Sequence, residues 1–358
     1  MKKQEFEKNV EEARKSFAYA NYLIVRDAVF AMLEQQSKWD ASPSGYWRTE
    51  LEGFDYLLDA SPLIIAKLRH HAYHLTGLKE YEYRDHHSRI APQLARRLFQ
   101  LKKRDVHGVR ISESPLMGGF GYTIDHELYN ADTLKFYESL IILDEARILD
   151  QFRHSQERKI VCEIGAGWGG LAYQFKTLFP NTTYVIVDLP GSILFGATYL
   201  KTIFPHAKTL IIDGAQDSAK IPNAKEYDFI FVPHFAWKEL TMPRPDLLIN
   251  MCSFQEMTTA QVENYIAKAR AWGIPCVYSI NRDHSPNNSE LTRVSSIFSG
   301  YYAIIRDEYT FEVEPEIRGF FPKSILRRAK RVAKKIVFRP KKDIHAYRHL
   351  IGVLERTH

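Results

Sequence analysis

Apolar and polar positions change their spacing along the chain near Lys159. Before it, apolar side chains recur at intervals of three and four residues, as in Phe17, Ala20 and Ile24, which is the spacing of amphipathic helices. We therefore expect residues 1–115 to form a mostly helical N-terminal region. The stretches with the clearest helical spacing are residues 3–38, 61–75 and 92–103.

After Lys159, short apolar runs alternate with segments of helical spacing. This alternation is typical of a parallel sheet whose strands are joined by crossover helices. We expect an α/β domain with a Rossmann-like, mostly parallel sheet over residues 116–320, and a basic helix and tail over residues 321–358. The candidate strands are "IVCEI", "TYVIVD", "TLIID", "DFIFV", "DLLIN", "CVYSI", "YYAIIRD" and "YTFEV". The last two are joined by a short polar link, which predicts an antiparallel hairpin that closes the sheet.

Four glycines follow the first candidate strand, in "VCEIGAGWGG" (Val161 to Gly170), and a helical pattern follows them. The run fits G-x-G-x-x-G with Gly165, Gly167 and Gly170. Asp188 stands about 20 residues further on, where a dinucleotide-binding fold has its ribose-binding carboxylate. No Gly-Lys-Ser/Thr follows, which excludes a P-loop. The alternative interpretation is a structural glycine-rich turn that binds no ligand.

Glu163, at the end of this strand, separates the candidate ligands. A carboxylate there would lie close to the two charges of a pyrophosphate, which argues against NAD and FAD. S-adenosylmethionine carries a sulfonium, an ammonium and only one carboxylate, so an acidic strand end suits it. Glycines also let the backbone approach such a ligand closely. The pattern therefore predicts S-adenosylmethionine as the cofactor and the layout of a class I methyltransferase.

Longer stretches of the sequence resemble a known family. It comprises sugar O-methyltransferases encoded among bacterial genes for surface polysaccharide synthesis, and the similarity covers about residues 115–315. The resemblance implies a methyl transfer from S-adenosylmethionine to a sugar hydroxyl, in polysaccharide or glycan biosynthesis, and leaves the sugar unidentified. The segments that carry it are "EIGAGWGGLAYQFKTLFPNTTYVIVDLPGSILFGATYLKTIFP", "DLLINMCSFQEMT", "GGFG", "NADTLKFYESLIILDEA" and "VYSINRDH".

Each strand end has an expected role toward the donor, because ligands of open parallel sheets gather at the carboxyl ends of the strands. The glycine turn would hold the amino-acid end, Trp168 would close over it or pack the turn, and Asp188 would accept both ribose hydroxyls. For the far edge of the adenine, Asp213 with Gly214 competes with His234 and Phe235. The expected donor-binding residues are Glu163, Gly165, Ala166, Gly167, Trp168, Gly169, Asp188, Leu189, Asp213, Gly214, Asn250 and Ser253.

Methyl transfer to a hydroxyl needs a base, since a protonated hydroxyl is a poor nucleophile. Glu256 and His234 are the two candidates, with His284 and His126 behind them. The competing interpretation of Glu256 is a residue favoured by a helix N-terminus. That of His234 is a structural or adenine-contacting histidine.

Composition and charge indicate where the protein is located and in which state its cysteines are. No run of the 358 residues approaches the roughly 20 apolar residues of a membrane-spanning helix, and the first residues are charged, so we expect a cytoplasmic protein. Cys162, Cys252 and Cys276 lie in or beside apolar runs without a C-x-x-C pattern, which favours reduced, buried thiols. The oligomeric state stays open.

The basic segment, residues 322–342, holds ten Lys or Arg and no acid, so its positive charge exceeds the net charge of +6 of the whole chain. A solvated helix packed by its apolar stripe is the default interpretation. The alternatives are peripheral contact with the inner face of a membrane and contact with nucleic acid. We expect no nucleic-acid partner, because "SFQEM" is not the Asn/Asp-Pro-Pro-aromatic string common in base methylation.

Two histidine-rich segments raise the question of a metal. His70, His71 and His74 lie in one, and His86 and His87 in the other. His70 and His74 would share a helix face, as zinc ligands can, but no carboxylate completes the set. We expect no metal ligands among them, while a divalent ion that orients a sugar diol stays open.

Two rival functions also stay open. One is a methyltransferase of the same fold that methylates an oxygen or nitrogen of a non-sugar small molecule. The other is a non-catalytic protein that binds S-adenosylmethionine.

Overall fold

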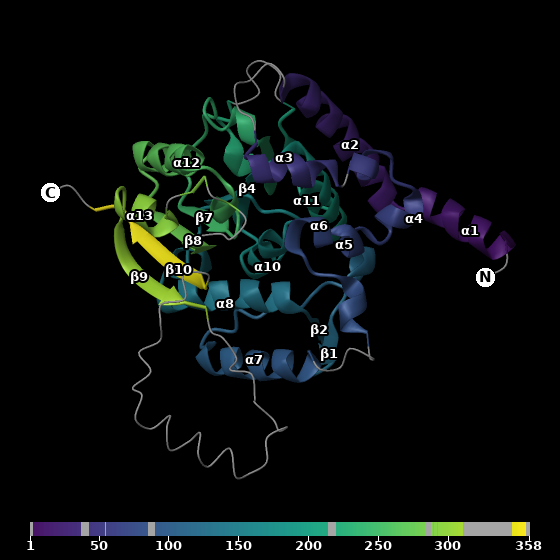
Figure 1. Cartoon of the computed structure of the whole chain (residues 1–358), viewed down its shortest axis with the longest axis horizontal. Coiled ribbons are helices and arrows are strands. Elements are labelled where there is room, and N and C mark those ends of the chain that lie inside the picture. The colour runs from purple at the N-terminus through teal and green to yellow at the C-terminus, as the bar shows by residue number, and fades with distance from the viewer. Residues whose placement is uncertain are drawn as a thin grey trace, which may run out of the picture.

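The chain folds around one large sheet with helices on both sides (Figure 1). Its eight strands follow the order β5-β6-β4-β3-β7-β8-β10-β9. β10 runs antiparallel to both of its neighbours, and the other pairs are parallel. The computed structural model describes residues 3–36, 43–53, 55–84, 90–213, 220–283, 288, 290, 291, 293–310 and 346–355.

Seven of the eight predicted strands form the sheet together with β10, and the Rossmann-like fold class is confirmed. Central strands β3, β4, β6 and β7 are buried almost throughout, because helices cover both of their faces. The strands of the large sheet are β3 (Lys159–Ile164), β4 (Thr182–Asp188), β5 (Thr209–Ile211), β6 (Phe229–Pro233), β7 (Leu247–Met251), β8 (Cys276–Arg282), β9 (Ala303–Tyr309) and β10 (Tyr347–Val353). A separate small sheet pairs β1 (Tyr122–Ile124) with β2 (Glu127–Tyr129).

The antiparallel closure forms, but its second strand is not the expected "YTFEV", most of which lies outside the described residues. β9 pairs with β10, and β10 also pairs with β8. Two side chains explain why β10 docks there. Buried His349 is 2.7 Å from the Tyr278 hydroxyl, and Arg348 bridges Asp283 and Asp307. The sheet therefore extends into residues 321–358, which the sequence assigned to a basic tail.

The N-terminal region is helical as expected, although residues 61–75 form short helices instead of one. This region holds α1 (Lys3–Arg14), α2 (Phe17–Gln36), α3 (Gly45–Glu52), η1 (Asp55–Asp59), α4 (Pro62–Ile65), α5 (Leu68–His71), α6 (Tyr73–Thr76), η2 (Glu80–Tyr83), α7 (Ala91–Arg104) and η4 (Leu116–Gly118). Later helices are α8 (Ala131–Glu145), α9 (Asp150–Arg153), α10 (Gly170–Leu178), α11 (Pro190–Ile203), η5 (Ala224–Glu226), η6 (His234–Ala236), η7 (Phe254–Glu256), α12 (Thr259–Ala271) and α13 (Val294–Ser299).

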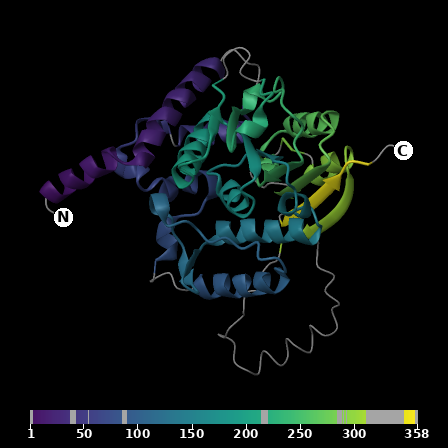
Figure 2. The same cartoon turned by 180° about the vertical axis from the view of Figure 1, so that it is seen from behind.

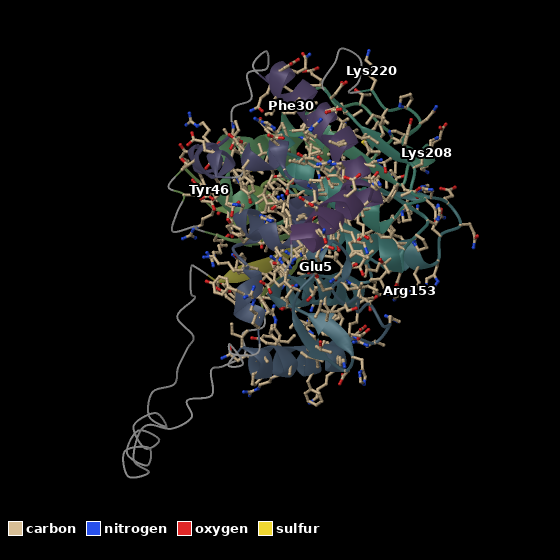
Figure 3. The ribbon with its side chains drawn as sticks, turned by 90° about the vertical axis from the view of Figure 1, so that its right-hand side faces the viewer. Glu5, Phe30, Tyr46, Arg153, Lys208 and Lys220 are labelled. Carbon is tan, nitrogen blue, oxygen red and sulfur yellow. The ribbon has the colours of Figure 1, made fainter. Side chains whose placement is uncertain are left out.

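The N-terminal helices lie against the α/β domain along two sides. α2 runs beside α11, where Asn21 donates a hydrogen bond to Thr202 Oγ1 at 3.3 Å, while α1 extends outward with no buried residue (Figures 1 and 2). α7 packs on α8, which crosses below the sheet in Figure 1. α3 lies at another part of the surface. Its Tyr46 is labelled in Figure 3, on the opposite side of that view from Lys208.

Asn130 is the N-cap of α8, where it forms a reciprocal capping box with Thr133. Asp132 is thereby left inside the first turn with its carboxylate buried, where it accepts hydrogen bonds from Arg69 and Trp168.

Among the described residues, no helix is long and apolar enough to cross a membrane. The basic segment, residues 322–342, lies outside the described residues, so its predicted helix and its membrane contact stay predictions.

Candidate functional site

A cavity of about 500 Å³ opens at the carboxyl ends of β3, β4, β6 and β7. This is the edge at which open parallel sheets bind ligands. We name its two sides after the roles expected from the sequence. The donor half contains Glu163, the turn at residues 165–167, Asp188 and His234, and the acceptor half contains Glu256 with its neighbours Ser44, Trp47 and Lys135. The predicted site residues that line the cavity are Glu163, Gly165, Ala166, Gly167, Trp168, Asp188, Leu189, His234, Ser253 and Glu256.

The glycine turn requires glycine for its shape and for its packing. Gly165 has a φ of 72°, and a Cβ built on it would lie 2.2 Å from Ser253 Oγ. Gly167 has a φ of 57° and directs its N–H to the Asp188 carboxylate. A side chain at either position would strain the backbone or fill the cavity edge. The turn thus exposes backbone to the cavity, as the sequence predicted.

Asp188, the last residue of β4, is fixed by the backbone around it. One oxygen accepts the Gly167 N–H at 2.8 Å and the other accepts the Leu189 N–H at 2.7 Å. Burial raises the pKa of Asp188 to about 6, against the lowering effect of these hydrogen bonds. The Ser192 side chain and the Ala166 N–H also donate hydrogen bonds to the Asp188 carboxylate.

Glu163 lies beneath the turn, 2% exposed, and accepts a hydrogen bond from the Tyr184 hydroxyl at 2.8 Å. Burial raises its pKa to about 8, and the Asp188 carboxylate adds to the rise. Glu163 is therefore mostly protonated at pH 7 in the absence of a ligand. A cation placed against it would favour its ionised form.

The strand order separates the two alternatives for the far edge of the donor site. β6, not β5, lies beside β4, and Asp188 pairs in register with Pro233. His234 and Phe235 follow at once and line the cavity. Asp213 follows β5 at the sheet edge and does not line the cavity, and Gly214 lies outside the described residues. The geometry favours His234 with Phe235.

Two predicted donor residues support the site from behind. Asn250 is fully buried and donates to the Ile164 carbonyl and to Ser253 Oγ, so it ties the ends of β3 and β7 together. Gly169, with a φ of 82°, starts α10 against Leu200. Neither residue lines the cavity.

Glu256 stands in the acceptor half, in contact with the N-terminal region. The Ser44 hydroxyl donates to the Glu256 carbonyl at 2.7 Å, and the Trp47 side chain hydrogen-bonds to the Glu256 carboxyl group. Burial raises the pKa of Glu256 to about 8, although Trp47 and Lys135 act to lower it. Ser44 and Trp47 both line the cavity. α3 therefore forms a wall of the cavity beside this candidate base.

A buried charge network joins the N-terminal region to the glycine turn. Arg69 Nε donates to Glu113 at 2.7 Å and its Nη2 donates to Asp132 at 3.2 Å. The guanidinium also lies 3.7 Å from the centre of the Trp168 ring, and the Trp168 indole donates to Asp132 at 3.3 Å. Of the two roles expected for Trp168, this packing supports the structural one.

The histidines are arranged differently from the expectation. α5 ends at His71, so His70 and His74 do not share one helix. His71 and His74 instead approach Tyr56, at 2.7 and 3.5 Å, and His70 packs on Phe120. Within the described part of the chain, no three His, Cys, Asp or Glu residues are grouped as metal ligands. His86, His87 and His284 lie outside the described residues.

Sequence reasoning missed Ser44, Trp47 and Lys135. Lys135 lines the cavity from the first turns of α8, and its ammonium lies 3.2 Å from Asp132 Oδ1. No motif marks these residues, because each reaches the cavity through packing between segments far apart in the sequence. Cys252 also lines the cavity with a φ of 60°, whereas Cys162 and Cys276 are buried as expected.

Comparison with known proteins gives similarity at the level of structure alone. No protein-family model and no curated protein sequence matches the chain. Among solved structures, magnesium protoporphyrin IX methyltransferase from Synechocystis, with bound S-adenosylmethionine, is 9% identical over 62% of this chain and 84% of its own, with a TM-score of 0.34. Precorrin-6y C5,15-methyltransferase from Geobacter metallireducens is 15% identical over 59% and 85%, with a TM-score of 0.34.

Phosphoethanolamine N-methyltransferase 2 from Haemonchus contortus is 13% identical over 60% of this chain and 52% of its own, with a TM-score of 0.32. These scores are too low to support an argument about activity. The fold assignment rests instead on the strand order and on the antiparallel β10.

Proposed function

We propose that this protein is a class I methyltransferase that transfers a methyl group from S-adenosylmethionine to a hydroxyl group of a sugar. One observation carries the proposal. Glu163 and Asp188, at the ends of neighbouring parallel strands, line the same cavity on either side of a glycine turn that a side chain would obstruct. Two carboxyl groups and an open backbone suit a cationic amino acid joined to a ribose.

The donor half fits each part of S-adenosylmethionine. Glu163 would receive the ammonium group, because a buried carboxyl group gains most from a paired cation. Asp188, which lines the cavity at the end of β4, would accept the ribose hydroxyls. Phe235, which is buried beside His234, offers an apolar surface for the adenine.

The residues of the acceptor half would prepare the attacking hydroxyl. When bound, S-adenosylmethionine supplies an electrophilic methyl group. Glu256 would accept the hydroxyl proton once it is ionised, and α3 would hold it in place through Ser44 and Trp47. The walls contributed by Trp47 and Phe136 would exclude water from the reacting hydroxyl.

The choice of a sugar rests on the sequence resemblance over about residues 115–315 and is the finer part of the proposal. A non-sugar acceptor with a hydroxyl or amino group would use the same donor half. Product analysis therefore has to identify the acceptor independently of donor binding.

Two measurements test the proposal in order. Calorimetric titration of the full chain with S-adenosylmethionine should show one site, while NADH should show no fluorescence enhancement. Incubation with methyl-labelled donor and a panel of nucleotide sugars and glycan fragments should then give a methyl ether. Donor binding without any labelled product would support a non-catalytic binding protein, and tight NADH binding would contradict the assignment of the donor half.

A further inference from the structure

We propose that Lys135 forms an anion-binding subsite in the acceptor half, so that the acceptor is an acidic sugar with a carboxylate or phosphate group near the methylated hydroxyl. This inference rests on the proposed function, because it names the chemistry of the acceptor. The observations that carry it are the place of the Lys135 side chain in the cavity, its hydrogen bonding and its neighbours.

The Lys135 ammonium has unused hydrogen-bonding capacity inside the cavity. An ammonium group has three N–H donors. In the described part of the chain, its one hydrogen-bond acceptor is Asp132 Oδ1 at 3.2 Å. The side chain is 25% exposed and lines the cavity, so two donors remain for a ligand.

The Asp132 carboxylate also interacts with residues other than Lys135. Its other oxygen accepts hydrogen bonds from Arg69 and Trp168, so one carboxylate serves two cations. Glu113 balances Arg69 on the side away from the cavity. An anionic group of a ligand would accept the remaining hydrogen bonds of the Lys135 ammonium on the cavity side.

Lys135 stays charged in this position. Burial lowers its pKa, but Asp132, then Cys252 and Tyr347, outweigh burial and leave the pKa above its ordinary value. The carboxyl groups it faces across the cavity are those of Glu256 and Glu163, which have pKa values of about 8. At pH 7 these two are mostly protonated and supply little negative charge.

Lys135 interacts with groups on the β7 and β10 side of the cavity and also with the donor half. Its electrostatic neighbours Cys252 and Glu256 follow β7 and Tyr347 begins β10, while Lys135 also lowers the pKa of Glu163. Asp188 and His234, on β4 and after β6, lie on the other side of β3 in the sheet order. An acceptor between Lys135 and Glu256 would therefore meet a cation and a base together.

Paired sugar probes test the subsite. Ligand-observed NMR titrations would compare D-glucuronate with D-glucose, D-galacturonate with D-galactose, and D-glucose 6-phosphate with D-glucose, in the presence and absence of S-adenosylhomocysteine. The variants are Lys135→Met and Lys135→Gln, which remove the charge, Lys135→Arg, which keeps it, and Lys103→Met on α7 as the matched control. Thermal unfolding of each variant checks that it is folded.

We expect wild type to bind the acidic member of at least one pair at least tenfold more tightly than its neutral partner. Lys135→Met and Lys135→Gln should lose that difference, while Lys135→Arg and the control should keep it. The carboxylate and phosphate pairs distinguish which anion is recognised.

Two results overturn the inference: a wild type without acidic preference in every pair, or charge-removing variants that keep the preference. A Lys135→Met variant that weakens S-adenosylhomocysteine binding while keeping the sugar preference would assign Lys135 to the donor carboxylate instead. The titrations without S-adenosylhomocysteine measure the preference for acidic sugars even if the donor does not bind. Failure of the proposed function, seen as absent donor binding in wild type, is thus separate from failure of the subsite.

Discussion

The donor half and the acceptor half of the cavity are built in different ways. The donor half comes from the ends of neighbouring strands β3, β4 and β6 and from the turn that directly follows β3. The acceptor half joins Ser44 and Trp47 from the N-terminal region to Lys135 on α8 and to Glu256 after β7. Local chain geometry therefore fixes the donor half, whereas the acceptor half depends on how the N-terminal region packs.

The two halves should respond separately to substitution. A change in the donor half should alter donor affinity, and a change in the acceptor half should alter turnover or acceptor affinity. Each substitution below either sharpens this division or breaks it.

The largest effect is expected for Glu256→Gln, which removes the candidate base. Turnover should fall by roughly 10² to 10⁴, the usual contribution of a positioned base, while calorimetric donor affinity stays nearly unchanged. Glu239→Gln, an exposed carboxyl substitution, is the control. A Glu256→Gln variant with near wild-type turnover would transfer the role to His234, His126 or His284.

The pH profile gives a second test of the same residue. A base must be deprotonated, and burial raises the pKa of Glu256 to about 8. Turnover should therefore rise with pH through about 8, later than the value of about 6.5 expected for a histidine base. An exposed carboxylate base would already be ionised at neutral pH, but burial raises the pKa of Glu256 above that range.

Asp188→Ala should have the next largest effect and should act on the donor alone. Loss of hydrogen bonds to a charged group costs about 1.5 to 3 kcal/mol, which corresponds to a donor Kd raised by roughly 10- to 150-fold. Asp125→Ala, at an exposed turn, is the matched control. Unchanged donor affinity in a folded Asp188→Ala variant would remove Asp188 from the ribose site.

The sequence predicted which residues of the donor half line the cavity, because these residues follow their strands directly. Glu163 and Asp188 each stand at the carboxyl end of a recognisable strand, and parallel pairing brings those ends together. The strand beside β4, whose end would form the far edge of the adenine site, was undecided. Two apolar runs, Thr209–Ile211 and Phe229–Pro233, are equally good candidates for it. Which of them lies beside β4 depends on pairing across the sheet.

The acceptor half and the end of the sheet could not be predicted in this way. Lys135 occupies an ordinary polar position of a helix, and its place beside Asp132 at the cavity follows from tertiary packing. β10 was missed because proximity in sequence favoured a hairpin with the next apolar run. The interactions that select β10, His349 with Tyr278 and Arg348 with two aspartates, are long-range.

Donor affinity should also depend on pH through Glu163. Its pKa is about 8 without donor, and a bound ammonium would favour the ionised form, so binding should release a proton below pH 8. Affinity should then increase with pH up to about 8, by at most tenfold per pH unit, and level off above it. Glu163→Gln should bind the donor more weakly at pH 8 and lose this dependence. Calorimetry in buffers of different ionisation enthalpy measures the proton release directly, and its absence in wild type would contradict the role of Glu163.

The smallest effect is expected for Trp47→Phe, which keeps the aromatic wall and removes the indole N–H. Trp47 lowers the pKa of Glu256, so its loss should raise that pKa. One hydrogen bond contributes about 0.5 to 1.5 kcal/mol, which corresponds to a shift of about one pH unit or less. Turnover should therefore drop by at most about tenfold at pH 7 and recover at high pH, with donor affinity unchanged.

The matched control for Trp47→Phe is Trp272→Phe, because Trp272 is half-buried and does not line the cavity. Its pH profile should coincide with that of wild type. A Trp47→Phe variant whose turnover falls equally at every pH would show that Trp47 only packs against the acceptor. A variant that instead loses donor affinity would break the division of the cavity, because α3 would then support both halves.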